Sequence, residues 1–60
     1  MSRKHYIAVA AMLKLNKPGK EFDLDALCAW QNIVHGLADL FKADNAAFDR
    51  SRFLAAAGLE

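Results

Sequence analysis

The stretch from residue 24 to residue 43 carries a regular apolar pattern that constrains the fold more than any other feature. Apolar side chains recur there at alternating steps of three and four, the spacing of one helix face: Leu27, Trp30, Val34, Leu37 and Phe41. Four more residues widen this face beyond what one small partner helix can cover: Leu24, Cys28, Ile33 and Leu40. The opposite stripe is small and polar: Ala29, Asn32, Gly36, Asp39 and Ala43. The pattern predicts a long helix with several packing partners.

A Pro-Gly pair and several capping residues divide the rest of the chain. Pro18 and Gly19 end a first helix that we expect over about residues 3–16. Residues whose side chains accept hydrogen bonds from free amides precede each expected helix: Ser2, Asp23 and Asp49. Gly58 is the expected stop of a third helix over about residues 50–57, and Lys42 together with the Asp44-Asn45 pair marks the end of the second.

Aromatic residues flank two of the expected helix starts. Phe48 precedes the Asp49 cap, and Phe53 occupies the fourth helical position, which is the spacing of a hydrophobic staple. Phe22 and Leu27 have a similar relation at the start of the second helix. Because no strand-like alternation occurs, we expect a single all-α domain over residues 1–60, a small three-helix protomer.

The short length of the chain favours self-association. The protein has 60 residues, and its single cysteine excludes an internal disulfide and a multi-cysteine zinc site. The first helix is apolar nearly all round between Tyr6 and Leu13, and such a helix is normally surrounded by protein. The two other helices of so small a chain cannot surround it. We therefore expect a homodimer or a higher homo-oligomeric helical bundle, with the first helix near the interface.

Several classes of function are disfavoured. The longest apolar run has eight residues, too short to cross a membrane, and a free cysteine without an export pattern fits a cytoplasmic protein. Cys28 and His35 lie two helical turns apart, too far for a nucleophile and its base, and we expect Cys28 to be a small buried residue. We expect His35 to lie at the boundary of the apolar face. The chain shows no paired carboxylates, metal-ligand motif or phosphate loop, so we expect no catalysis, no cofactor and no metal.

Charge is distributed unevenly along the chain. Residues 1–20 contain five cationic side chains and no acid, whereas residues 21–60 contain three basic and seven acidic side chains. Cations at helix starts gain nothing from the helix dipole, so their presence there needs another reason. We expect an anion-binding site formed by Arg3, Lys4, His5, Arg50 and Arg52, with Tyr6 as a stacking surface. The alternative is ordinary pairing, in which Arg50 and Arg52 bind Asp49, Asp44 or a neighbouring subunit.

The sequence is also compatible with two other functions. A small DNA-binding regulator would use the third helix to read bases, but apart from its two arginines that helix is mostly apolar. A structural or assembly protein would need no ligand at all. A regulator would lose DNA affinity steeply with salt, and an assembly protein would retain its activity without Arg50 and Arg52.

Both ends of the chain resemble a group of short, mostly uncharacterised proteins encoded by bacteriophages and prophages. The resemblance rests on Arg3-Lys4-His5-Tyr6-Ile7-Ala8, on Leu37-Ala38-Asp39-Leu40-Phe41, on Asp44-Asn45 and on the segment from Phe48 to Gly58. Its most distinctive part is the Phe-Asp-Arg-x-Arg-Phe pattern at residues 48–53. The resemblance implies a viral accessory protein in the cytoplasm of a bacterial host. Such proteins often act by stoichiometric binding, for example by sequestering a nucleotide signal or blocking a host or defence protein.

Taken together, the residues and the resemblance predict a non-catalytic binding protein. The expected partners are a second copy of the chain and an anionic ligand, which is a nucleotide, a nucleic acid or an acidic patch on a bacterial protein. No membrane partner is expected.

Overall fold

A computed structural model describes residues 3–19 and 24–59, and it contains three helices. Helix α1 spans Arg3–Leu15, α2 spans Leu24–Asp44, and α3 spans Arg50–Ala56. No strand occurs among these residues. The all-α prediction is therefore confirmed, and each helix begins at the expected residue and ends within one residue of the expected position. The predicted caps at Ser2 and Asp23 and the staple residue Phe22 lie outside the described residues.

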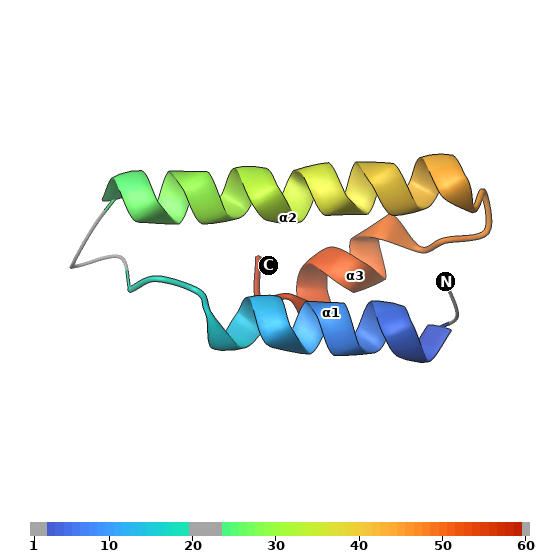
Figure 1. Cartoon of the computed structure of the whole chain (residues 1–60), viewed down its shortest axis with the longest axis horizontal. Coiled ribbons are helices and arrows are strands. Elements are labelled where there is room, and N and C mark those ends of the chain that lie inside the picture. Colours follow the sequence, from blue (N-terminus) through green and yellow to red (C-terminus); the bar gives the residue numbers. More distant parts are fainter. Residues whose placement is uncertain (1–2, 20–23, 60) are drawn as a thin grey trace.

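The two longer helices run in opposite directions along the long axis of the molecule, and α3 lies between them (Figure 1). The molecule measures 36 × 18 × 16 Å, and α3 packs against both α1 and α2. The start of α1 and the connection between α2 and α3 lie at the same end of the molecule (Figure 1). This arrangement brings residues from three distant parts of the sequence together.

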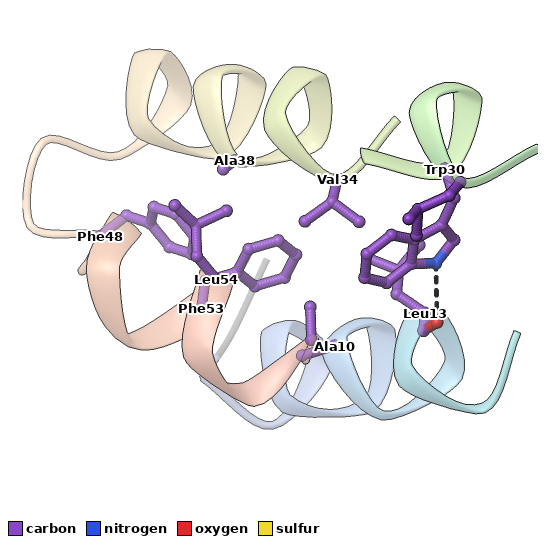
Figure 2. Packing of buried hydrophobic residues seen from close by; sticks show 10 residues of the cluster. Ala10, Leu13, Trp30, Val34, Ala38, Phe48, Phe53 and Leu54 are labelled. Carbon is purple, nitrogen blue, oxygen red and sulfur yellow. Dashed lines mark hydrogen bonds between the residues drawn. The ribbon is translucent and has the colours of Figure 1, made fainter. Parts of the chain in front are cut away.

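The core is apolar and is filled from all three helices (Figure 2). Val34 and Ala38 of α2 are completely buried at its centre. The Trp30 indole Nε1–H donates a hydrogen bond of 2.9 Å to the Leu13 carbonyl, which fixes α2 against the end of α1 (Figure 2). The remaining buried residues are Ala10, Leu27, Phe48, Phe53, Leu54 and Ala57.

Four aromatic rings form a contiguous cluster at the other end of the core. Phe41 lies 5.5 Å from both Phe48 and Phe53, and the Phe48 and Phe53 rings are also 5.5 Å apart. The fourth ring, Tyr6, contacts Phe41 and Phe48. Tilted and edge-to-face contacts at these separations are favourable for aromatic rings. The predicted staple between Phe48 and Phe53 is confirmed.

Both ends of α3 are capped as the sequence predicted. The Asp49 carboxylate accepts a hydrogen bond of 3.0 Å from the Arg52 amide. At the other end, Gly58 has a φ of +89°, its amide donates to the Ala55 carbonyl, and the Leu59 amide donates to the Leu54 carbonyl. This pair of bonds is a Schellman motif, and glycine suits its left-handed residue because a Cβ is disfavoured there.

Lysine side chains hold the connections in place. The Lys42 ammonium donates to the carbonyls of Ala46 and Phe48, which ties the end of α2 to the segment before α3. Lys17 donates to the Gly58 carbonyl, and its ammonium lies 5.4 Å from the centre of the Trp30 ring. These contacts link the end of α3 to the other two helices.

Large apolar side chains remain exposed on the outer sides of both long helices. On α1, Ala10 and Leu13 are buried, whereas Met12 and Leu15 are exposed. On α2, the residues expected to widen the buried face are instead exposed: Leu24, Cys28, Ile33 and Leu40. The prediction of a buried Cys28 is therefore wrong within this chain, because α1 and α3 together cover only one side of α2. Among the described residues, no helix has the length and apolar character needed to cross a membrane.

Replacing Gly58 tests the cap of α3. We expect Gly58→Ala to lower the free energy of unfolding by about 1 kcal/mol, because an L-residue is disfavoured at positive φ. The added Cβ would also lie 3.4 Å from Cγ of Lys14. Urea unfolding followed by circular dichroism measures the change. D-alanine at position 58 of the synthetic chain is the control and should preserve stability. Equal stabilities for the two alanine forms would contradict this account of the cap.

Candidate anion-binding cleft

A cleft of about 630 Å³ lies between α1 and α3 and is closed at one end by the connection from α2 to α3. Small-molecule sites in proteins commonly have volumes between about 300 and 1,000 Å³. The apolar part of the lining includes Ile7, Ala10, Ala47, Phe48, Phe53 and Ala56. The polar part consists of Arg3, Tyr6, Asn45, Asp49 and Arg52.

Arg3 and Arg52 supply the cationic groups of the cleft. Arg3 begins α1, and Arg52 lies in the first turn of α3, so the two residues come from opposite walls. Both are exposed, and neither guanidinium has a partner among residues 3–19 and 24–59. Arginine presents several N–H donors in a planar fork that suits carboxylate and phosphate oxygens. The pair can therefore bind an anion from two sides.

Tyr6 also lines the cleft, and its ring packs against other aromatic rings of the core. The ring lies 4.9 Å from that of Phe41 and 4.7 Å from that of Phe48. Its hydroxyl is buried and has no hydrogen-bond partner within the described part of the chain. A buried hydroxyl without a partner costs free energy. Tyr6 thus supports the cleft and places an unused donor close to it.

The oxygen-bearing side chains of the cleft already hold the backbone. Asp49 Oδ1 accepts from the Arg52 amide, and Asn45 Oδ1 accepts from the Ala47 amide at 3.0 Å. Both bonds shape the connection between α2 and α3. Two arginines and one aspartate leave the cleft with a formal excess of positive charge.

Arg50 lies on a different side of α3 and does not line the cleft. Its Nε donates to Asp39 Oδ1 at 2.9 Å, and its Nη2 lies 3.0 Å from His35 Nδ1. Because a guanidinium only donates, the contact requires Nδ1 of His35 to accept, with the ring proton on Nε2. Arg50 is therefore paired within the chain, as the alternative interpretation of its charge predicted. Its partner is Asp39 rather than Asp44 or Asp49.

The other residues expected at the site lie elsewhere. Lys4 and His5 are exposed on α1 and do not line the cleft. The structure thus brings together Arg3, Tyr6 and Arg52 from the predicted set. It adds residues that sequence reasoning did not select, chiefly Ile7, Phe48 and Asn45. The Phe48 staple and the turn-forming Asn45 were visible in the sequence as structural signals, but neither pattern indicated a cleft.

The described residues contain no cluster of three side chains able to hold a metal ion. Cys28 is exposed on α2, and His35 is engaged by Arg50. In comparisons with protein-family models, with curated proteins and with solved structures, nothing matches this chain.

The contact between Arg50 and Asp39 can be measured with a double-mutant cycle. We expect Arg50→Ala and Asp39→Ala to show a coupling free energy of about 0.5 kcal/mol, because both side chains are substantially exposed. Urea unfolding of the single and double variants gives this value. The coupling should shrink as salt is added. A coupling of zero at low salt would show that the two groups do not interact in solution.

Removing the Tyr6 hydroxyl tests whether it lacks a partner. We expect Tyr6→Phe to leave the free energy of unfolding unchanged or to raise it by up to about 1 kcal/mol, because no hydrogen bond is lost. Thermal unfolding of the ligand-free protein provides the measurement. A loss of more than about 1 kcal/mol would indicate that the hydroxyl has a partner in solution.

Proposed function

We propose that this protein is a non-catalytic binding protein that holds an organic anion in the cleft between α1 and α3. The observation that carries the proposal is the pair Arg3 and Arg52, which lie on opposite walls of one cleft and have no partner among the described residues. A phosphate or carboxylate group between them would receive charge-assisted hydrogen bonds from both sides.

The rest of the lining supports an anion with an apolar or aromatic body. Ile7, Ala47 and Ala56 offer apolar surface beside the arginines, and the Phe48 and Phe53 rings lie behind it. The cleft has room for a mononucleotide, whose phosphate would meet the guanidiniums while its base contacts the apolar wall. We therefore favour a nucleotide over a simple inorganic anion.

A DNA-binding regulator is less well supported. One side of the third helical segment is buried through Phe53, Leu54 and Ala57. Arg50 forms an ion pair with Asp39 of α2. The exposed residues of α3 are Ser51, Arg52, Ala55 and Ala56, which offer little to base edges. The same two arginines could instead bind an acidic side chain of a bacterial protein, which would enter the cleft in place of the nucleotide.

The biological consequence follows if the chain is encoded by a bacteriophage, as its resemblance implies. A small protein that binds a nucleotide stoichiometrically lowers the free concentration of that nucleotide in the host cytoplasm. This removes a signal without any catalytic step. The proposal also includes self-association, which is supported by the exposed apolar side chains on the outer sides of α1 and α2.

Isothermal titration calorimetry with adenosine 5′-monophosphate as the probe tests the proposed site. We expect the nucleotide to bind clearly more tightly than inorganic phosphate or adenosine. Phosphate lacks the group that contacts the apolar wall, and adenosine lacks the group that contacts the arginines. The double variant Arg3→Ala with Arg52→Ala should weaken nucleotide binding by about 100-fold, since each charge-assisted contact is worth about 1.5 kcal/mol.

The matched control is Lys4→Ala with Lys14→Ala, which removes the same charge from exposed sites that do not line the cleft. It should change the affinity less than about threefold, through the long-range field alone. Equal losses of nucleotide affinity in the two double variants would show that binding depends only on net charge and not on the two cleft arginines. No binding of the nucleotide, of phosphate or of adenosine would overturn the proposal.

A further inference from the structure

A second apolar stripe runs along α2 on a side that neither α1 nor α3 covers. Its members follow steps of four and three: Ala29, Ile33, Gly36, Leu40 and Ala43. All five are exposed, and Ile33 and Leu40 retain 56% and 66% of their accessible surface. The mean step of 3.5 residues is typical of helices that pair along their length. These five residues are called the outer stripe.

Gly36 at the centre of the outer stripe has no explanation within a single chain. Glycine is unfavourable in the interior of an exposed helix. Its φ is not positive, and a Cβ added there would meet nothing within 4 Å. The fold of one chain would therefore accept alanine or a larger residue. Close approach of another backbone is a reason for glycine at such a position.

We propose that the outer stripe is the interface of a homodimer in which the two α2 helices pack antiparallel about a two-fold axis. Large and small residues alternate along the stripe, with Ile33 and Leu40 between Ala29, Gly36 and Ala43. Antiparallel pairing centred near the middle of α2 places Ile33 against Gly36 of the partner subunit. It also places Ala29 against Leu40 of the partner subunit, and the two-fold axis repeats both contacts.

The alternation argues for a second copy of the chain and for this direction. In the central layers of this antiparallel pair one large residue meets one small residue, so the two surfaces interlock there. A parallel pair would put Gly36 opposite its own copy and leave a gap, while the two Leu40 side chains met head on. An isologous two-fold contact needs only one surface that is complementary to itself, and the outer stripe has this property.

The size of the surface fits a dimer of modest affinity. Helix α2 has 21 residues. A helix of that length is about 31 Å long and about 11 Å wide, so each copy offers roughly 350 Å² in projection. Because side chains make the surface uneven, its accessible area exceeds this projected area. The two copies together would bury on the order of 1,000 Å² of accessible surface, near the lower limit for a specific interface. We therefore expect dissociation constants in the micromolar range.

Charge favours α2 over α1 as the interface. The outer side of α1 is also apolar, but α1 carries Arg3, Lys4 and Lys14 and no acid, so two copies would repel each other there. Helix α2 carries Asp25, Asp39 and Asp44 against Lys42, and because Arg50 pairs with Asp39 its net charge is smaller in magnitude than that of α1. The interface is thus expected on α2, whereas the sequence analysis placed α1 near it.

The inference adds a surface to the self-association part of the proposed function and does not depend on the anion. No residue of the outer stripe lines the cleft. Dimerisation and anion binding can therefore fail independently, and each has its own measurement.

Sedimentation velocity over roughly 1 to 500 µM protein, using Gly36→Leu, tests the interface. A Cβ at position 36 meets nothing within 4 Å and the residue is exposed, so circular dichroism and nucleotide titration of Gly36→Leu should match those of the parent protein. The dimer dissociation constant should rise by at least about tenfold, because the larger side chain blocks close approach. Any nonspecific apolar association would instead be strengthened by this substitution.

Ala11→Leu on the exposed side of α1 is the matched control, since it creates the same side chain at another small exposed residue and adds only one carbon fewer. We expect it to leave dimerisation unchanged. A parent protein that remains monomeric at every concentration would overturn the inference. So would a dimer that tolerates Gly36→Leu, or one that is weakened by Ala11→Leu.

The direction of the helices can be measured with a spin label on Cys28, the single cysteine, which is exposed on α2 away from the outer stripe. In the antiparallel dimer the two labelled positions lie about 20 Å apart along the helix axis, because 13 residues separate Cys28 from the position opposite its partner. In a parallel dimer they would lie side by side. A double electron–electron resonance distance shorter than about 15 Å between backbones would contradict the antiparallel arrangement.

Discussion

The fold depends on how a helix of seven residues is held between two longer ones. An isolated helix as short as α3 is not stable in water. It persists here because Asp49 caps its start, the turn at Gly58 satisfies its last carbonyls, and Phe53 and Leu54 are buried in the core that the three helices share. Because α3 packs against both α1 and α2, the positions of the long helices are set through it. Loss of any of these contacts would loosen all three helices together.

The same constraint creates the cleft. The aromatic cluster fixes the start of α3 beside the start of α1, and this places Arg52 across from Arg3. Arg50, two residues earlier on α3, is rotated by about 200° around the helix axis and therefore reaches Asp39 on α2. One arginine thus fastens α3 to its neighbour, while the other remains available to a ligand. The cleft and the outer stripe lie on separate surfaces, so the proposed binding and the proposed assembly would not compete for residues.

Much of the helical layout was predictable because it follows from local rules. The three–four spacing through Trp30 and Val34, the Asp49 cap and the Gly58 stop each depend on residues close in sequence. The burial of Ala38 and the exposure of Cys28 were not predicted, since both depend on which side of α2 faces the other helices. Arg50 and Arg52 were expected at one site, although residues two apart do not share a helix face and therefore point in different directions. Which of them would face a cleft depended on the rotation of α3, and no local rule fixes that rotation.

Direct observation of the arginine side chains provides the sharpest test of the cleft. Nuclear magnetic resonance spectra of the Nε–H groups resolve each arginine while adenosine 5′-monophosphate is titrated into the labelled protein. The account predicts that the Arg3 and Arg52 signals shift together and saturate at one nucleotide per chain, while the Arg50 signal, already bonded to Asp39, stays in place. Equal shifts for all three arginines, or a shift of Arg50 alone, would contradict it.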